Sequence, residues 1–537
     1  MVGAAAGPGP SGSAGPTIQG VALDSRSVLA GDLYVALAGR AQHGARYVVD
    51  AVRAGAVAVL TDAEGADLAS AELGGAFGDA VPPVVAVDDP RRVMAFVAAR
   101  VYGQPAATMT MFAVTGTNGK TTTSFLLDAA LRAAGQHTGV VGTIGYLLDG
   151  VPLEATRTTV TTPESPDLQA LLAVLAESGA QSCVMEVSSH ALALHRADAI
   201  VFDVAAFTNF GRDHLDFHGD EESYFEAKAL LFTPERTRRA VVNVDDDRGR
   251  VLVGRLTAAA VPTVTVSLVN PAADYWVSHA ELGVDGVTSV QLRTPGGAVA
   301  FGLGLPGDHN VRNAITALAM IDVIRSLPGP GAPVREAAVE AIDLARAAGG
   351  LAAATVPGRM ERVDLGPGAP AVFVDFAHTP QAVAAALSAV AGRRRVVVLG
   401  AGGDRDPDKR GPIGAAAAAA AEVVIVTDDN PRSEDPAAIR RQVLSGARSG
   451  GHAGLRDAGV SAARVLDPRI IDGGDRRAAI RHGLEVAGPE DVLLILGKGH
   501  EVGQEIDGTV LPFNDVAVVR DEWLALAGAG ARGGSTS

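Results

Sequence analysis

The 537-residue sequence has one cysteine, few aromatic residues and fewer basic than acidic side chains. The single cysteine, Cys183, excludes an internal disulfide framework and any metal site built from several cysteines. It lies in the apolar run 182–185, where we expect a buried thiol rather than a nucleophile. With 45 Lys and Arg against 61 Asp and Glu, the net charge is −16. This balance argues against a protein that mainly binds nucleic acid, but not against a nucleotide substrate, whose phosphates need only a few local donors.

Targeting and membrane segments are also missing from the sequence. Residues 1–16 are rich in Gly, Ala, Pro and Ser and contain no basic residue, so we expect a disordered leader and not a signal peptide. No uncharged apolar run reaches the ~18 residues that a membrane span needs. The alanine run that ends at Ala421 is followed by Glu422, and it predicts a helix that leads into a strand. These features predict a cytoplasmic protein in a reducing compartment.

A chain of this length exceeds one ordinary core and predicts about three domains. After the leader, we place the domains at 17–107, 108–353 and 354–537, with a linker near 348–357. A β-rich meander is expected over 261–305, followed by a helix near 310–326. Expected strands are 32–38, 110–115, 182–187, 204–208, 240–244, 371–376, 395–399, 423–427 and 492–496, and the first domain continues in helical and apolar segments to 84–87. Their alternation with helical segments predicts α/β domains with mostly parallel sheets.

The most informative segment is 112–123, in which a strand leads into a Gly-rich turn and then a helix. Backbone amides in such a turn can surround phosphate oxygens. Lys120 would reach the outer phosphates and the Thr121 hydroxyl would bind Mg²⁺. Val114 stands where the strict phosphate-loop pattern has its first glycine. The alternative is a tight strand-to-helix turn that carries a surface lysine.

A phosphate loop also needs a carboxylate on a neighbouring strand to organise its metal ion. Glu186 ends the apolar run 182–185, which places it at the carboxyl end of a strand, where open α/β sheets bind ligands. A structural ion pair is the alternative role for Glu186. The segment 208–218 is dense in Asn, Asp and His, although a capping or core role is as plausible for any single histidine there.

Several motifs together resemble the Mur ligases of bacterial cell-wall synthesis. They are TGTNGKTT in the loop, EVSSHAL, TNFGRDHLDFHG, YFEAKALLF, and the segments 307–314, 356–361 and 375–380. The resemblance runs in order from about Leu23 to Phe513. Folylpolyglutamate synthetases share the loop and the ligation chemistry, but they are not expected to carry the third-domain motifs.

The resemblance implies a small N-terminal α/β domain for a uridine nucleotide, a central P-loop ATPase-type domain and a C-terminal Rossmann-like domain for an amino acid. The implied activity is an ATP-dependent amide ligation. It adds meso-2,6-diaminopimelate to the D-glutamate side chain of UDP-N-acetylmuramoyl-L-alanyl-D-glutamate through an acyl phosphate. Two Mg²⁺ ions and a monomeric chain are expected, with neither a nucleic-acid nor a membrane partner.

Matched motif positions then assign roles around the nucleotide. The implied ATP-binding residues are Gly116, Thr117, Asn118, Gly119, Lys120, Thr121, Thr122, Asn313, Arg359 and Asp375. The implied metal ligands are Thr121, Glu186, His214 and Lys228. Lys228 matches a lysine that CO₂ converts to a carbamate (N6-carboxylysine), which turns a repelling ammonium into an anion. Lys120, Glu186, His214 and Lys228 form the implied catalytic set.

The remaining matches concern the sugar-peptide substrate. Its implied contacts are Leu23, Ser25, Arg40, Ala41, Gln42, Thr161, Thr162, Ser188 and Arg196. Some family members have glutamine two residues before the matched Arg196, where this chain has Leu194. We therefore leave Leu194 out of the site.

The segment 428–432, Asp-Asp-Asn-Pro-Arg, follows a predicted strand and bears on the choice of amino acid. On residues alone, a turn with a solvated arginine is the favoured interpretation of this segment. In the family it marks the use of diaminopimelate, whose distal carboxylate a guanidinium can bind with two hydrogen bonds. The same guanidinium would repel the distal ammonium of lysine. The implied amino-acid site is Arg405, Asp429, Asn430, Pro431, Arg432, Gly497 and Glu501.

Two alternatives stay open at this point. The same ligation could use L-lysine or another amino acid. A protein of another class, an ATP-binding regulatory module without ligase activity, would keep the phosphate loop but would not need the third-domain motifs.

Overall fold

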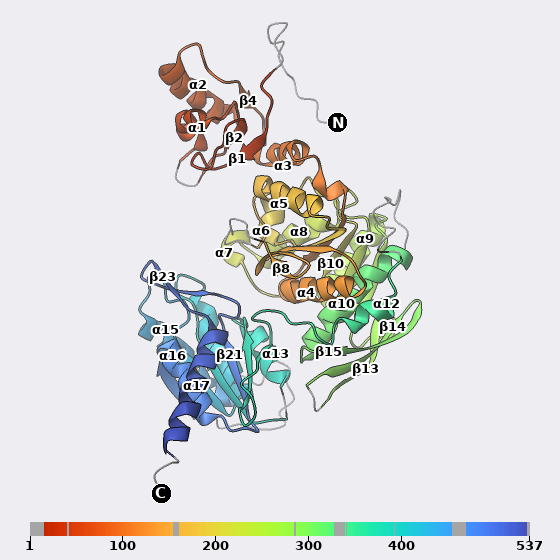
Figure 1. Cartoon of the computed structure of the whole chain (residues 1–537), viewed down its shortest axis with the longest axis vertical. Coiled ribbons are helices and arrows are strands. Elements are labelled where there is room, and N and C mark those ends of the chain that lie inside the picture. Colours follow the sequence, from red (N-terminus) through yellow and green to blue (C-terminus); the bar gives the residue numbers. More distant parts are fainter. Residues whose placement is uncertain are drawn as a thin grey trace.

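The structure is a computed structural model, and the residues that it describes are 15–39, 42–153, 161–283, 286–326, 339, 341–390, 392–453 and 469–533. Arg40 and Ala41, two of the predicted substrate contacts, and most of the predicted leader lie outside these residues. The described strands form sheets of four, eleven and six strands in chain order, with one further two-stranded hairpin. Figure 1 shows the three sheets with their helices as successive bodies of the chain. In the described ranges, no helix is both long and apolar enough to cross a membrane.

The N-terminal sheet is parallel throughout, in the order β1 (Gly20–Ala22), β2 (Asp32–Ala36), β3 (Ala58–Thr61) and β4 (Val84–Ala86). Alternate residues of β2 face opposite sides: Tyr34 packs with α1 (Val48–Ala54) and α2 (Ala63–Phe77), and Val35 packs with α3 (Pro90–Val101). This period of two is the reason that both faces of the sheet are covered.

The central sheet has the order β15-β14-β13-β12-β11-β10-β5-β9-β6-β7-β8. Its parallel strands are β5 (Thr110–Thr115), β6 (Thr138–Gly142), β9 (Ser182–Glu186), β10 (Val204–Phe207), β11 (Ala240–Asn243), β12 (Thr263–Ser267) and β13 (Tyr275–Leu282). Antiparallel strands extend both ends: β7 (Gly145–Leu148) and β8 (Val151–Pro152) at one, β14 (Thr288–Thr294) and β15 (Gly297–Leu303) at the other. The predicted β-rich meander is thus a continuation of the main sheet.

Helices cover both faces of the central sheet. On one face, α4 (Lys120–Ala133), α10 (Asp308–Ser326) and α12 (Leu344–Gly349) pack against Phe112 and Val114 of β5. On the other, α5 (Ser165–Glu177) and α9 (Asp247–Ala258) pack against Met111 and Ala113. The predicted linker 348–357 is not a free connection, because Ala348, Leu351 and Val356 are buried in the first of these cores.

The C-terminal sheet has the order β16-β17-β21-β18-β19-β20 and is parallel except at its β16 edge. Its strands are β16 (Glu361–Val363), β17 (Ala371–Asp375), β18 (Arg395–Leu399), β19 (Val423–Thr427), β20 (Arg469–Gly474) and β21 (Val492–Leu496). Helices α13 (Pro380–Ser388), α14 (Arg410–Ala420) and α15 (Pro436–Ala453) cover one face, and α16 (Arg476–Val486) and α17 (Asp515–Gly533) cover the other. The hairpin of β22 (Gly503–Ile506) and β23 (Thr509–Pro512) follows β21. The predicted α/β fold class is confirmed.

Candidate active site

The predicted phosphate loop connects β5 to α4, as the sequence indicates. Gly116 and Gly119 have φ values of +146° and +86°, a region that favours glycine. A Cβ atom at Gly119 would lie 2.5 Å from Asn313 Oδ1, and one at Gly116 would overlap the Thr208 hydroxyl. The loop is also tied to the strand beside it, because Thr117 N donates to Asn209 O at 2.9 Å. These two glycines therefore allow the loop to lie closely between α10 and the end of β10.

Two lysines share one backbone carbonyl under this loop. Lys120 Nζ donates to Gly116 O at 2.9 Å and to Thr117 O at 3.0 Å, and Lys228 Nζ donates to the same Gly116 O at 2.9 Å. Lys228 is 1% exposed and its ammonium lies 4.3 Å from the centre of the Tyr224 ring. Burial, with the charge of Lys120, lowers the pKa of Lys228 well below its usual value. A buried lysine with a depressed pKa is the form of amine that can react as a nucleophile.

Glu186 ends β9 beside the loop, at the sheet edge that the sequence predicts. Its carboxylate is fully buried and accepts from the Thr121 hydroxyl at 2.9 Å, the Thr143 amide at 2.9 Å and the Thr143 hydroxyl at 3.0 Å. A carboxylate next to a hydroxyl supplies the oxygen ligands that Mg²⁺ prefers, so Thr121 and Glu186 fit the predicted ion. Among the described residues there is no group of three His, Cys, Asp or Glu side chains placed to hold a metal ion.

His214 lies outside this buried group. It begins α7 (Leu215–His218) with a φ of +54°, and its imidazole is 47% exposed. Its ring packs edge-on against His190, with 4.8 Å between centroids, and Nε2 lies 3.5 Å from the Asp213 carboxylate. Although burial acts in the opposite direction, His214, His378 and Lys120 lower the pKa of Asp213. Asp213 is therefore an anion whose charge acts on Lys120 of the loop, and the sequence reasoning assigned it no role.

The C-terminal domain contributes a cation to the same region. The Arg359 guanidinium lies 4.3 Å from the centre of the Phe376 ring. Burial lowers the pKa of Arg359, while the negative charges of Asp375, Glu186 and Glu501 oppose that change. Because Glu186 belongs to the central sheet, part of the negative charge that acts on Arg359 comes from the neighbouring domain. Asp375 instead orders its own turn, since its carboxylate accepts from the amides of Met360 and Ala377 at 2.7 and 2.8 Å.

The predicted sugar-peptide contacts of the central domain gather beside Glu186. Thr162 Oγ1 donates to Glu186 O at 2.9 Å, Thr161 Oγ1 accepts from Thr143 Oγ1 at 3.1 Å, and Ser188 caps α6 (Ser189–Ala193). In the N-terminal domain, Leu23 packs in the local core and Gln42 bonds to the Tyr47 hydroxyl. Ser25 lies in the turn after β1 and is half-buried.

Glu164, which the sequence reasoning missed, connects Arg196 to the N-terminal domain. Its carboxylate accepts from Arg196 Nε at 2.9 Å and from Arg91 Nη1, on α3, at 2.7 Å. Arg196 Nη1 also donates to Thr162 O at 3.1 Å. One carboxylate thus binds an arginine from each of two domains.

The predicted amino-acid site forms where the loops after β18, β19 and β21 meet. Asp429 and Asn430 are each 8% exposed, and Asn430 Nδ2 donates to Glu501 Oε2 at 2.8 Å. A Cβ atom at Gly497 would overlap the Asp429 carboxylate, and one at Gly402 would lie 3.1 Å from Arg432 Nη1 and 4.0 Å from the Arg405 side chain. Pro431 is buried in the same loop, where its carbonyl lies against Gly403. The structure therefore brings together all seven residues of this prediction.

Arg432 and Glu501 already have charged partners in this arrangement. Arg432 has a φ of +52°, donates from Nη1 to Gly403 O at 2.6 Å, and pairs through Nε with Glu505 at 3.2 Å. Glu501 accepts from Lys498 at 2.8 Å. Lys498 and Glu505 are the two members of this site that the sequence reasoning left without a role.

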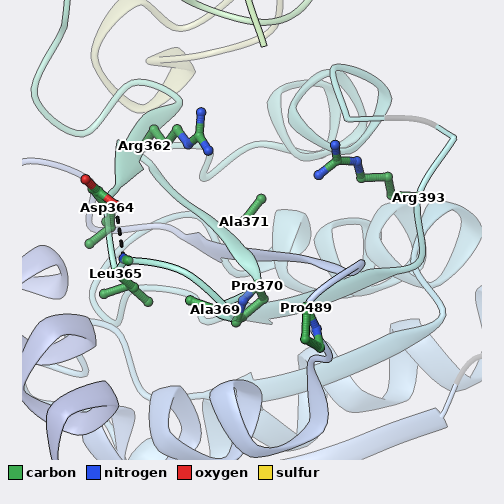
Figure 2. A pocket seen from close by; sticks show the side chains of 10 residues that line it. Arg362, Asp364, Leu365, Ala369, Pro370, Ala371, Arg393 and Pro489 are labelled. Carbon is green, nitrogen blue, oxygen red and sulfur yellow. Dashed lines mark hydrogen bonds between the residues drawn. The ribbon is translucent and has the colours of Figure 1, made fainter. Parts of the chain in front are cut away.

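A hollow of about 150 Å³ lies elsewhere on the C-terminal domain, and Figure 2 shows the residues that line it. Arg362 of β16 and Arg393, which precedes β18, stand on either side of it, with Ala371 at the start of β17 between them. The lining contains none of the predicted site residues, and the predicted amino-acid site lies at the opposite, carboxyl ends of the parallel strands of this sheet.

Comparison with known proteins extends over the described domains. Three family models match: "Mur ligase family, catalytic domain" at 17–102, "Mur ligase middle domain" at 114–321 and "Mur ligase, glutamate ligase domain" at 358–499. The UDP-N-acetylmuramoyl-L-alanyl-D-glutamate--2,6-diaminopimelate ligase of Streptomyces coelicolor is 43% identical over 520 residues, covering 95% of this chain and 93% of the relative. The UDP-N-acetylmuramyl-tripeptide synthetase of Leifsonia xyli is 40% identical over 505 residues, covering 93% and 90%.

Solved structures give the same picture at the level of the fold. A UDP-N-acetylmuramoyl-L-alanyl-D-glutamate--2,6-diaminopimelate ligase matches with a TM-score of 0.62 and 30% identity, covering 95% of each chain. The folylpolyglutamate synthase of Mycobacterium tuberculosis, solved with ADP and AMPPCP, matches with a TM-score of 0.56 and 22% identity, covering 80% of this chain and 93% of that one. The second likeness concerns the fold alone.

Proposed function

The chain belongs to the Mur ligase family, and on that premise we propose that it adds meso-2,6-diaminopimelate to UDP-N-acetylmuramoyl-L-alanyl-D-glutamate at the expense of ATP, in peptidoglycan synthesis. The observation that supports this proposal is that Arg359 of the C-terminal domain is close enough to Lys120, Glu186 and Glu501 for their charges to interact. The phosphate loop of the central domain lies within the electrostatic reach of Arg359, whose own domain holds the amino-acid loops. ATP, the D-glutamate carboxylate and the incoming amino group could therefore meet between them.

The chemistry explains why such a site needs ATP. A carboxylate is a poor electrophile at neutral pH until its oxygen becomes part of a good leaving group. Transfer of the γ-phosphoryl group to the D-glutamate side chain forms an acyl phosphate. The amino group of diaminopimelate then attacks the carbonyl carbon, and the tetrahedral intermediate expels phosphate. The protein contributes position and charge neutralisation, which are the main terms in phosphoryl transfer.

The residues of the loop divide this work. We assign ATP binding to Gly116–Thr122 as a set, with Lys120 moving from the loop carbonyls to the phosphate oxygens. Arg359 and Asn313 would approach the nucleotide from the other side, and Asp375 would keep the Arg359 turn in shape. Bound Mg²⁺ supplies further neutralisation of the phosphates, and Thr121 and Glu186 would hold one such ion.

Lys228 is assigned the carbamate, and His214 the neighbouring metal position. Attack of a neutral amine on CO₂ forms the N–C bond, and loss of the amine proton leaves an anion. The lowered pKa of Lys228 favours the neutral amine that this step needs. The carbamate would also place a negative charge beside the Lys120 ammonium, which donates to the same Gly116 O.

Diaminopimelate would bind through its distal end to Arg432, with Arg405, Asp429 and Glu501 around it. Thr161, Thr162, Ser188 and Arg196 would bind the peptide part of the other substrate, and the N-terminal domain would bind its uridine. We further propose that the chain acts as a cytoplasmic monomer, divided at 17–107, 108–353 and 354–537.

Mass analysis of the product tests the proposal. The purified chain is given ATP, Mg²⁺, the UDP-dipeptide and an equimolar mixture of meso-diaminopimelate, L-lysine and L-ornithine. We expect one product, heavier by one diaminopimelate residue, and phosphate release that requires both the UDP-dipeptide and the amino acid. Equal incorporation of lysine would reject the proposed specificity. Nucleotide binding without substrate-dependent phosphate release would instead favour a regulatory module.

A further inference from the structure

Lys498 is a fully buried lysine that contacts two residues of the proposed amino-acid site, and it lies in the loop that follows β21. Its ammonium donates to Asn430 Oδ1 at 3.0 Å and to Glu501 Oε2 at 2.8 Å, and its side chain is 0% exposed. Lysine is rarely buried to this extent, because its charge loses hydration, unless it is paired. The position of Lys498 therefore depends on the two residues that it contacts, and both belong to the proposed site.

These contacts fix which way the Asn430 amide points. Asn430 Oδ1 accepts from Lys498 Nζ and also from the Glu505 amide at 2.9 Å. Both partners are donors only, so the atom facing them must be the oxygen. Nδ2 then faces Glu501 Oε2, to which it donates at 2.8 Å. An amide group has two N–H bonds, and this orientation presents the donor end of Asn430, not its acceptor, to the site.

Lys498 also holds the Glu501 carboxylate. Glu501 is 34% exposed, so without a cation beneath it the side chain could turn toward solvent. With Lys498 in place, one carboxylate oxygen stays beside Asn430. A carboxylate and an amide donor held side by side match an amino acid, which has an ammonium and a carboxylate on the same carbon.

We propose that Lys498 is a positioning residue that orients Asn430 and Glu501 toward the incoming amino acid. This inference rests on the proposed function, because it takes those two residues as amino-acid contacts. Lys498 itself is covered and does not touch the substrate. The loop 428–432 has two further contacts that do not involve Lys498. Gln504 Nε2 donates to Asp429 O at 2.7 Å, and the Glu505 amide donates to Asn430 Oδ1, so the loop should keep its position when Lys498 is replaced.

Kinetics of Lys498→Met test the role, because methionine has similar length and no charge. We expect the KM for the amino acid to rise at least tenfold, while the KM for ATP and for the UDP-dipeptide change less than twofold. Arg395→Met is the matched control. It removes a cation that pairs with Glu422 at 3.3 Å at the start of β18, at the amino ends of the parallel strands and away from the amino-acid site. The control should leave all three KM values within twofold. An unchanged amino-acid KM in Lys498→Met, or an equal rise in all three, would overturn the proposal.

Combining Lys498→Met with Glu501→Gln covers the case in which Lys498→Met fails to fold. It removes both charges of the pair, so no buried charge is left without a partner. If Lys498 acts through Asn430 and Glu501, adding Lys498→Met to the variant Asn430→Ala/Glu501→Gln should leave the amino-acid KM within twofold. A further rise of tenfold would overturn the proposal. The KM is measured for whichever amino acid the wild type incorporates, so a wild type that prefers lysine would reject the proposed specificity and still decide the role of Lys498.

Discussion

Replacing Arg432 by methionine removes the guanidinium that we assign to the distal carboxylate of diaminopimelate. In the structure, Nη1 donates to Gly403 O at 2.6 Å and Nε pairs with Glu505 at 3.2 Å. These two contacts use Nε and one hydrogen of Nη1. The second hydrogen of Nη1 and the hydrogens of Nη2 can then bind a ligand. A carboxylate could therefore bind with two parallel hydrogen bonds without displacing Glu505.

The size of the effect follows from those two bonds. Hydrogen bonds to charged groups contribute about 1.5–3 kcal/mol each, and the Arg432 side chain is 23% exposed, so solvent reduces the total. We take about 2–3 kcal/mol for the pair. Since about 1.4 kcal/mol corresponds to a tenfold change, kcat/KM for diaminopimelate should fall roughly 30- to 150-fold.

The assay is phosphate release with each substrate varied in turn. The KM for ATP should stay within twofold, and the preference for diaminopimelate over lysine should fall, because the repulsion of the lysine ammonium is also removed. Arg440→Met is the control, since Arg440 pairs with Asp428 and with Asp472, at 2.8 Å, beside the same strand ends. Equal rises in the KM for ATP and for diaminopimelate in Arg432→Met would refute the reasoning and indicate a structural loop.

Three further predictions concern the central domain. Lys228→Ala should lose most activity and regain part of it with added short carboxylic acids, which replace the carbamate; absence of recovery in the phosphate-release assay would count against the carbamate. Gly119→Ala places a side chain at φ +86°, 2.5 Å from Asn313 Oδ1, so we expect ATP affinity to fall at least tenfold by calorimetry, with UDP-dipeptide affinity unchanged. Burial raises the pKa of the Cys183 thiol to about 12, so iodoacetamide should label it at neutral pH only when denaturant unfolds the chain; rapid labelling of the native protein would contradict this.

The strands of the C-terminal domain were predictable because they are continuous runs of Val, Ile and Leu. β18, β19 and β21 have the predicted bounds, and each is almost wholly buried between two layers of helices. The parallel arrangement places the loops after these strands at one end of the sheet, in agreement with the resemblance to the family, which had assigned Asp429 and Gly497 to one site.

The edge elements escaped prediction for the opposite reason. β20 is a partly exposed edge strand with the sequence Arg-Ile-Ile-Asp-Gly-Gly, which lacks a clear period. The β22–β23 hairpin did carry a signal: Asp507-Gly508 connects the strands, and both residues have positive φ values, +47° and +73°. An Asp-Gly pair of this kind is typical of a two-residue hairpin turn.

The partners of the charged site residues were not predictable at all. Glu164 and Arg91 are far apart in the sequence, and Lys498 reaches Asn430 from a different strand. No periodicity encodes such pairs, because they depend on how loops from separate strands are placed in space. The motifs predict which residues act on substrates, and the structure adds the partners that contact those residues.

The position of the Glu164 carboxylate has a consequence for the length of the substrate that the protein can bind. The carboxylate joins Arg91 of the first domain to Arg196, which we assign to the peptide end of the substrate, with distances of 2.7 and 2.9 Å. If the uridine end binds to the first domain, the contacts of Glu164 with Arg91 and Arg196 fix the distance between the binding sites for the two ends of the substrate. Analogues with a shorter connection between uridine and glutamate would then bind at only one of the two sites at a time. The full-length molecule would bind at both sites at once and therefore with higher affinity.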